Sequence, residues 1–230
     1  MKTLNIRSVL RRNLFFISLR LRSRGEDPKD YIVKKGATDI CIDGYPRSAN
    51  SFSVRMFQQA NPDAHIAHHT HSIANLQKAI KYNIPVIVLI RDPEQSIVSS
   101  VIAHKNNDVD NEVYRYIDFY TWVYKSIDKM VVSDFEQVIN DFNTVIMNVN
   151  NQYNESFSLL DDVKEADHQV KDDIEKRYDR LGQAEMAHIK PVPTNERNAS
   201  KEKFRNTVLM HDGFCEAKKL YENIMQHVVR

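Results

Sequence analysis

An unbroken apolar run from Ile84 to Ile90, Ile-Pro-Val-Ile-Val-Leu-Ile, constrains the fold more than any other feature of this sequence. The run does not alternate between apolar and polar side chains, so both of its faces must be covered. A strand covered on both faces is typical of a parallel sheet with helices on either side. The run ends at Arg91-Asp92-Pro93, which indicates a turn at the end of the strand.

Strand-like and helix-like segments alternate along the rest of the chain. Further strands are predicted at residues 39–43 and 130–132, where short β-rich runs occur. This alternation predicts an α/β fold, a P-loop-like three-layer domain in which helices flank a central parallel sheet. Helices are predicted from apolar periodicity at residues 52–60, 96–103, 135–148, 163–181 and 215–228.

Composition excludes several other classes of protein. The chain has 230 residues, of which 42% are hydrophobic and 27% charged, as in ordinary globular domains. A chain of this length buries about 70% of its unfolded surface, so it needs neither metal nor disulfide to hold a core. No apolar run approaches the ~18 residues that would cross a bilayer. The two cysteines, Cys41 and Cys215, are predicted to be buried thiols in a reducing compartment, which favours a cytoplasmic location.

The positive charge is concentrated at the N-terminal end. Seven of the 32 basic residues precede the first acid, Glu26, so the remainder carries 25 basic and 31 acidic residues, a net charge of −6. We therefore predict a basic N-terminal arm or helix, residues 1–30, and a single domain, residues 31–230. The arm either packs on the domain or lies on an anionic membrane as a peripheral contact. Nucleic-acid binding is not expected, because aromatic and basic residues are not interleaved. The seven basic residues are Lys2, Arg7, Arg11, Arg12, Arg20, Arg22 and Arg24.

A polar loop follows the first predicted strand and leads into a helix. Such a loop is a ready anion site, because free backbone N–H groups and the positive end of the helix dipole meet there. Residues 44–51, Gly-Tyr-Pro-Arg-Ser-Ala-Asn-Ser, keep the first glycine and the final hydroxyl of the nucleotide-binding pattern Gly-x-x-x-x-Gly-Lys-Ser/Thr. Ala49 replaces the second glycine, Asn50 replaces the lysine, and the cation has moved to Arg47. This change favours an anion that needs no magnesium.

The same loop resembles a known family. Residues 45–52, Tyr-Pro-Arg-Ser-Ala-Asn-Ser-Phe, are similar to the 5′-phosphosulfate loop of sulfotransferases that use 3′-phosphoadenosine 5′-phosphosulfate (PAPS), Tyr-Pro-Lys-Ser-Gly-Thr-Thr-Trp. The resemblance implies that Arg47 holds the phosphosulfate as charge develops on the leaving phosphate, and that Phe52 stacks on the adenine. A proline turn that caps a helix is the alternative. The implied donor-binding residues of the loop are Tyr45, Pro46, Arg47, Ser48, Ala49, Asn50, Ser51 and Phe52.

A second segment extends the resemblance. The family binds the 3′-phosphate with an arginine at the end of a strand and a serine eight residues later, and Arg91 and Ser99 have this spacing. An arginine fork with a hydroxyl donor suits a doubly charged phosphate. Alternatively, Arg91 pairs with Asp92 or Glu94 on the surface.

The resemblance covers residues 38–150 and becomes weaker toward the C-terminus. Residues 131–136, Val-Val-Ser-Asp-Phe-Glu, resemble the family's next strand and helix start. In the family, a late loop supplies further basic contacts to the 3′-phosphate, which implies this role for Arg197 and Lys201. The usual Arg-Lys-Gly run is absent from this sequence.

Four of the nine histidines lie between His65 and His71, in His-Ile-Ala-His-His-Thr-His. Extended backbone would place His69 and His71 on one face and His68 on the other. Cytosolic sulfotransferases carry Lys-Thr-His in the comparable place, with the histidine as general base. The local match implies His71 as the base, whereas the spacing to Arg91 implies His69. A His-x-His metal site and ordinary structural histidines are the alternatives, and no metal is expected because no nearby carboxylate or thiolate completes a ligand set.

These features imply a sulfotransferase that moves a sulfuryl group from PAPS to a hydroxyl acceptor, which is a small molecule, a lipid or a carbohydrate. Histidine would act as the base. A small P-loop-type kinase and a non-catalytic protein of the same fold that binds an anion or a partner are the alternatives, and magnesium dependence separates the kinase from the sulfotransferase. Four aromatic residues either line the acceptor pocket or belong to the core, and these are Tyr114, Tyr116, Tyr120 and Trp122.

Overall fold

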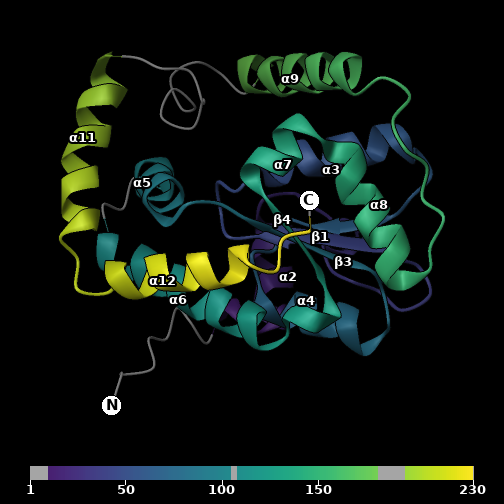
Figure 1. Ribbon diagram of the computed structural model, residues 1–230, viewed down its shortest axis with the longest axis horizontal. Coiled ribbons are helices and arrows are strands. Elements are labelled where there is room, and N and C mark those ends of the chain that lie inside the picture. The colour runs from purple at the N-terminus through teal and green to yellow at the C-terminus, as the bar shows by residue number, and fades with distance from the viewer. Residues whose placement is uncertain (1–9, 105–107, 181–194, 230) are drawn as a thin grey trace.

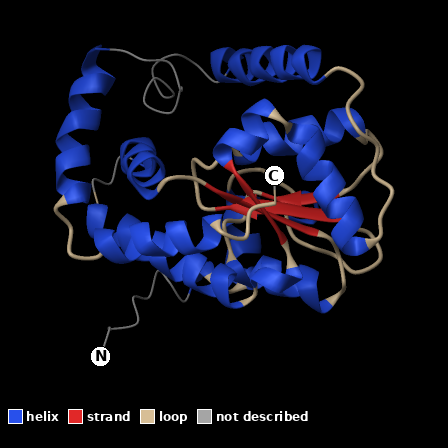
Figure 2. Ribbon diagram, in the orientation of Figure 1, coloured by secondary structure: helices blue, strands red, loops and turns tan. Residues whose placement is uncertain are grey.

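A four-stranded parallel sheet forms the centre of the molecule in the computed structural model (Figures 1 and 2). The strands lie in the order β2-β1-β3-β4, and every neighbouring pair is parallel. Their bounds are Ile40–Gly44 for β1, Ile66–His68 for β2, Val86–Ile90 for β3 and Val131–Asp134 for β4. The structure describes residues 10–104, 108–180 and 195–229.

Helices cover both faces of this sheet, so the predicted α/β fold with a parallel sheet flanked by helices is confirmed. The α-helices are α2 (Leu14–Ser23), α3 (Asn50–Ala60), α4 (Ile73–Lys81), α5 (Pro93–His104), α6 (Val109–Lys125), α7 (Phe135–Asn140), α8 (Phe142–Tyr153), α9 (Val163–Arg180), α11 (Asn195–Leu209) and α12 (Phe214–Met225). Two short 3-10 helices, η1 (Pro28–Asp30) and η2 (Ile127–Lys129), complete the described elements.

Strand β3 explains why its apolar run is uninterrupted, since its side chains are buried on both faces of the sheet. Val86, Val88 and Ile90 belong to a core cluster that includes residues of α4, α5, α6 and α12. Ile87 and Leu89 belong to the opposite cluster, which includes residues of α3, α7, α8 and α9. Because successive side chains of a strand point to opposite faces, only an uninterrupted apolar run fills both cores. Figure 1 shows α3, α7, α8 and α9 above the strands and α4 and α6 below them.

Two predictions about helices and loops are corrected by the structure. The single helix expected at residues 135–148 is two helices, α7 and α8, separated at Asp141. Asp141 has φ −151°, and its carboxylate accepts a hydrogen bond from the backbone N–H of Thr144, so it caps the start of α8 and ends the preceding helix. The basic segment expected to act as a late loop is the helix α11, which packs against α5 and places Val208 in the core.

The two cysteines differ in environment. Cys41 is buried in β1, and burial raises the pKa of its thiol. Cys215 is exposed on α12, which corrects the prediction of two buried thiols. The predicted break at residues 191–193 lies outside the described residues.

The N-terminal helix α2 rests on a small cluster of its own. Ile17 and Leu21 are buried against Ile32, which follows the 3-10 helix η1. Two of the basic residues assigned to the arm, Lys2 and Arg7, lie outside the described residues. The helices that the structure describes include none that is both long and apolar enough to cross a membrane.

Gly44 is the last residue of β1 and pairs with Leu89 of β3. A Cβ atom at this position would lie 2.4 Å from the backbone oxygen of Leu89. We expect Gly44→Ala to lower the free energy of unfolding by about 3 kcal/mol, because neither strand can move without breaking the ladder. Urea denaturation measures this loss. Gly36→Ala is the control, since Gly36 has open space around it and only its positive φ of 72° to accommodate, at a cost of about 1 kcal/mol. Equal losses in the two variants would contradict the steric explanation.

Candidate active site

The loop between β1 and α3 holds two residues in left-handed conformations. Arg47 has φ 71° and Ala49 has φ 66°, although neither is glycine. Such conformations are costly for residues with a Cβ atom and persist where the surrounding structure enforces them, often at ligand sites. Ala49 thus adopts the backbone shape for which glycine is better suited.

Helix α3 begins directly after this loop, at Asn50. The first N–H groups of any α-helix lack partners within the helix. Ala49 occupies the N-cap position of α3, and no side chain among the described residues caps the helix there. The first turn therefore offers N–H groups and the positive end of the helix dipole to an anion.

Several predicted loop ligands turn inward and shape the loop. Tyr45 is fully buried, and its hydroxyl donates to Glu112 Oε2 at 2.7 Å. Burial raises the pKa of Tyr45, and the charge of Glu112 raises it further. Asn50 Nδ2 donates to the backbone oxygen of Tyr45 at 3.0 Å and so ties the two ends of the loop together. Phe52, in the first turn of α3, is buried in the core. Pro46 and Ser48 of the loop are buried as well.

Arg47 and Arg91, the two arginines singled out in the sequence, interlock. Arg91 Nη1 donates to the backbone oxygen of Arg47 at 3.1 Å, and Arg47 Nε donates to Ser99 Oγ at 2.9 Å. The guanidinium of Arg91 lies 3.9 Å from the ring centre of Phe135, a cation–π contact that holds it in place. Burial lowers the pKa of Arg91, and the nearby charge of Arg47 lowers it further. Two cations held this close favour an anion between them.

The acidic residues beside Arg91 have other partners. Asp92 pairs with Lys218 at 2.9 Å, and Glu94 pairs with Arg205 at 2.6 Å. Among the described residues, neither acid forms an ion pair with Arg91, which removes the simple surface-pair interpretation of this arginine.

Three of the predicted cationic residues line one open pocket. It has a volume of about 310 Å³, and Arg47, Arg91, Ser99 and Lys201 all contribute to its wall. These four residues come from the loop after β1, the end of β3, α5 and α11. The two motifs that are separated by more than forty positions therefore face the same cavity rather than two separate ones.

The pocket wall also contains a basic residue that the sequence analysis missed. Arg205 of α11 lines the pocket one helical turn beyond Lys201. Arg197, Lys201 and Arg205 follow one another at intervals of four, which places them on one face of a helix. This spacing would have identified Arg205 if the segment had been interpreted as helical. The side chain of Arg197 lies outside the described part of the chain.

The histidine segment bends instead of staying extended. Strand β2 ends at His68, and both His69 and His71 have positive φ values, 53° and 49°. The backbone is therefore not extended here as expected, although the ring centres of His69 and His71 still lie 5.9 Å apart. The segment bends around the buried carboxylate of Asp43, whose Oδ2 accepts hydrogen bonds from the backbone N–H groups of Thr70 and His71 at 3.0 and 2.9 Å.

Asp43 is the residue that organises this side of the site, and the sequence analysis assigned it no role. Its Oδ2 also accepts a hydrogen bond from the Thr70 hydroxyl at 2.7 Å, and its Oδ1 accepts the backbone N–H of Gly44 at 2.9 Å. Burial opposes ionisation of this carboxyl, but the hydrogen bonds from His71, Thr70 and Gly44 outweigh it and lower the pKa of Asp43. An acidic residue at the end of an otherwise apolar strand was the available signal.

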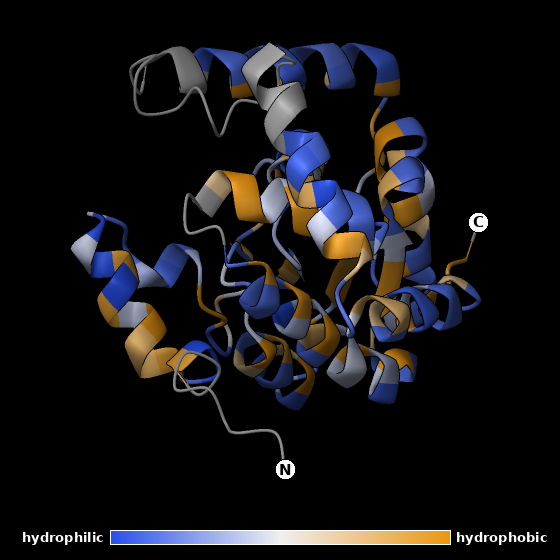
Figure 3. Cartoon of the chain, turned by 90° about the vertical axis from the view of Figure 1, so that its left-hand side faces the viewer, coloured by the Kyte–Doolittle hydropathy of each residue, from blue (hydrophilic) through white to orange (hydrophobic). Residues whose placement is uncertain are grey.

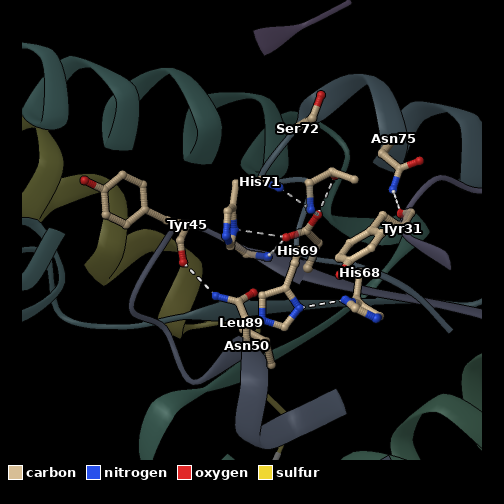
Figure 4. A network of polar contacts seen from close by, with 12 residues as sticks. Tyr31, Tyr45, Asn50, His68, His69, His71, Ser72, Asn75 and Leu89 are labelled. Atoms are coloured by element: carbon tan, nitrogen blue, oxygen red, sulfur yellow. Dashed lines mark hydrogen bonds and ion pairs between the residues drawn. The ribbon is translucent and has the colours of Figure 1, made fainter. Parts of the chain in front are cut away.

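The two candidate bases, His69 and His71, occupy different environments. Figure 4 shows both of them together with Tyr45 and Asn50 of the loop. His71 Nδ1 lies 2.7 Å from the backbone oxygen of Gly44 and 3.2 Å from Asp43 Oδ1. With Nδ1 donating to these acceptors, Nε2 is the atom that can take a proton. Both ring nitrogens of His69 have partners, since Nδ1 meets His68 Nδ1 at 2.7 Å and Nε2 meets Ser51 Oγ at 2.9 Å. This geometry favours His71 over His69 as a base.

The remaining predicted features are divided between core and surface. Tyr116 and Tyr120 are buried, Trp122 is half-buried against the same core, and Tyr114 is exposed. Tyr116 and Tyr120 donate hydrogen bonds to the backbone oxygens of Arg91 and Leu89, so they hold the C-terminal end of β3 in place. Within the described ranges, no three histidine, cysteine or acidic side chains are grouped so that they could hold a metal ion.

Comparison with known proteins finds similarity at the level of structure but not of sequence. No family model matches the sequence, and no curated protein matches it. A mouse sulfotransferase, SULT7A1, solved as a complex with PAP, is similar over 88% of this chain and 87% of its own, with 10% sequence identity and a TM-score of 0.42. At this level of similarity, the chemistry has to be inferred from the side chains.

Proposed function

We propose that this protein is a sulfotransferase that moves a sulfuryl group from PAPS to a hydroxyl acceptor. The observation that carries the proposal is the pocket that Arg47, Arg91, Ser99 and Lys201 share, next to an N-terminus of α3 that no described side chain caps. His71 lies on the other side of the same loop, bonded to Gly44. The proposed anion pocket and the proposed base are therefore connected through the one loop that begins at Gly44 and carries Arg47.

The residues fit the two charged ends of such a donor. PAPS would supply the sulfuryl group. The phosphosulfate suits the N–H groups of α3 and the guanidinium of Arg47, because both provide positive potential without a metal. The 3′-phosphate suits Arg91, Ser99 and the lysine of α11, because a doubly charged phosphate favours a fork of donors with a hydroxyl.

The chain's own groups can carry out the transfer. Nε2 of His71 takes the proton of the acceptor hydroxyl while that oxygen forms its bond to sulfur. The bond between sulfur and the bridging phosphate oxygen breaks, and the electron pair stays on the leaving phosphate. Arg47 and the N–H groups of α3 stabilise this charge. Asp43 and the backbone of Gly44 keep Nδ1 of His71 protonated, so that Nε2 remains the accepting atom.

A small kinase is the second candidate, and the loop argues against it. Asn50 stands where a P-loop has the lysine that neutralises the β- and γ-phosphates, and its side-chain nitrogen bonds to the loop itself. A non-catalytic anion-binding protein is the third candidate. It would use the pocket but would have no need for the Asp43–His71 pair.

Thermal-shift titration tests the proposal directly. Adenosine 3′,5′-bisphosphate should raise the unfolding temperature in proportion to its affinity, because a ligand that binds only the native state stabilises it. ATP with magnesium should produce a smaller shift. A larger shift with ATP and magnesium would favour the kinase. Binding of the bisphosphate without sulfuryl transfer to any of a panel of hydroxyl acceptors would favour the non-catalytic protein.

Substitution of the two arginines tests the pocket. Arg47→Ala and Arg91→Ala should each weaken adenosine 3′,5′-bisphosphate binding by about 10- to 100-fold, the usual value of a hydrogen bond between charged groups. Isothermal titration calorimetry measures this change. Arg55→Ala is the matched control, because Arg55 lies on α3 but pairs with Asp173 of α9. An Arg91→Ala variant that folds and binds as tightly as the wild type would remove this residue from the site.

A further inference from the structure

Helix α2 exposes large apolar side chains on the face that points away from the domain. Phe15, Phe16 and Leu19 are 66%, 44% and 45% exposed, whereas Ile17 and Leu21 are buried against the domain. Exposed leucines occur singly on many proteins, but two neighbouring phenylalanines with a leucine one turn later form a continuous apolar ridge. The ridge needs a partner that is itself apolar, at least in part.

Arginines flank this ridge. Arg12 precedes it, and Arg20, Arg22 and Arg24 follow it, while α2 contains no acidic residue. Figure 3 shows the same division, with a hydrophobic first part and a hydrophilic second part in the helix that continues from the N-terminal trace. The rest of the chain is net acidic, so this basic and apolar combination is confined to one end. Arginines beside exposed aromatic residues are typical of helices that lie at the interface of an anionic membrane.

The ridge is fixed next to the candidate active site. Ser72 Oγ donates to the backbone oxygen of Arg11 at 2.7 Å, and Ser72 follows His71 directly. Arg11 Nη2 donates to Asn111 Oδ1 at 3.4 Å, and Arg12 pairs with Asp118 of α6. These contacts connect the start of α2 to the histidine segment and to α6.

We propose that the outer face of α2 docks on an anionic lipid membrane, with Phe15, Phe16 and Leu19 entering the headgroup region and the arginines binding lipid phosphates or carboxylates. A second copy of the chain fits this face less well, because a symmetric contact would bring one cluster of arginines against another. Three side chains on a convex helix also cover far less than the ~800 Å² that each partner buries in a standard protein interface.

If the protein is the proposed sulfotransferase, docking through α2 also indicates which class of acceptor it uses. This part of the inference rests on the proposed function. Because α2 is connected to the histidine segment through Ser72, the membrane would lie on the side of the site where His71 accepts the proton. The acceptor class that this arrangement favours is a hydroxyl group carried by a membrane lipid. The docking itself does not depend on sulfuryl transfer and can be tested without any nucleotide.

Vesicle sedimentation of the full chain tests the docking. The protein should sediment with vesicles of phosphatidylcholine and phosphatidylserine, and much less with vesicles of phosphatidylcholine alone. Phe15→Ser with Phe16→Ser should weaken binding by at least about tenfold, because it removes the apolar ridge. Arg22→Gln with Arg24→Gln should weaken it by about 25-fold, since each arginine near an anionic surface contributes roughly a factor of five.

Matched controls distinguish binding through this patch from nonspecific binding to vesicles. Met210 is 86% exposed after α11, and Lys219 is exposed on α12, so Met210→Ser and Lys219→Gln remove an apolar and a basic side chain elsewhere. These controls should bind vesicles as the wild type does, and circular dichroism should show that all variants fold. The proposal is overturned if the wild type does not bind the anionic vesicles or if the Phe15 and Arg22 variants bind as well as the controls. It is also overturned if the wild type is a dimer in solution that the Phe15→Ser and Phe16→Ser changes dissociate, because the ridge would then be an interface between copies.

Discussion

Replacing His71 by alanine should lower turnover by about 10²- to 10⁴-fold, the usual contribution of a positioned general base. The affinity for adenosine 3′,5′-bisphosphate should stay close to that of the wild type, because His71 contacts Gly44 and Asp43 and does not line the pocket of Arg47 and Arg91. Steady-state kinetics with an acceptor that the wild type uses, combined with calorimetry, measures both quantities. Added imidazole should restore part of the lost activity if the missing group is a base.

His69→Ala is the matched control for this experiment. Both ring nitrogens of His69 have partners in Ser51 and His68, so its loss should change turnover far less than the loss of His71. The double variant should resemble His71→Ala in turnover and should still bind the nucleotide. Greater damage from His69→Ala would transfer the role of base to His69. Full activity of the double variant would remove histidine from the mechanism altogether.

Asp43→Asn should lower the free energy of unfolding by about 3 kcal/mol at neutral pH. The carboxylate accepts hydrogen bonds from three backbone N–H groups, those of Gly44, Thr70 and His71. An asparagine supplies only one acceptor oxygen and turns an N–H₂ group toward one of these donors. Urea denaturation measures the loss. Asp39→Asn is the control, because Asp39 also accepts a backbone N–H, from His65, but is exposed at the other end of the strand.

The stability that Asp43 contributes should depend on pH in a defined direction. Burial acts against ionisation, but the hydrogen bonds dominate and hold the pKa of Asp43 below its ordinary value. A depressed pKa means that the unfolded chain binds a proton more readily than the folded chain. The contribution is therefore complete above the unfolded value of about 4 and is lost as the pH falls through the lower folded value. The difference between wild type and Asp43→Asn should shrink on acidification below about pH 4, and a constant difference down to pH 2 would contradict this assignment.

Much of the fold could be predicted because short apolar runs and apolar periodicity indicate which segments form the core. The apolar run that ends at Ile90 has to be covered on two sides, and only a parallel sheet between helices provides this cover. The break at Asp141 and the helical state of residues 195–209 were not predicted. Asp141 ends one helix by capping the next, but the apolar periodicity continues across it, so the periodicity alone predicted one helix. Helix α11 is stabilised by its packing against α5, and such a long-range contact leaves no pattern in the local sequence.

The sequence singled out several residues of the candidate site but did not reveal how they are arranged. Arg47, Arg91 and Ser99 stood out because each lies at a strand end or at a fixed spacing from one. Asp43 was missed because its role depends on a segment almost thirty residues away that folds around it. Arg205 was missed because the helix that carries it was taken for a loop.

The sequence by itself determined the parallel α/β sheet and the presence of cationic residues at strand ends, because apolar periodicity and chain direction act over a few residues. Only the tertiary structure decided that Arg47, Arg91 and Lys201 share one pocket and that Asp43 orients His71. These contacts join segments far apart in the chain, and they depend on strand order, on the bend after β2 and on the packing of α11. The physical reason is that the ends of neighbouring parallel strands converge only after the core has closed, so no single stretch of sequence contains the site.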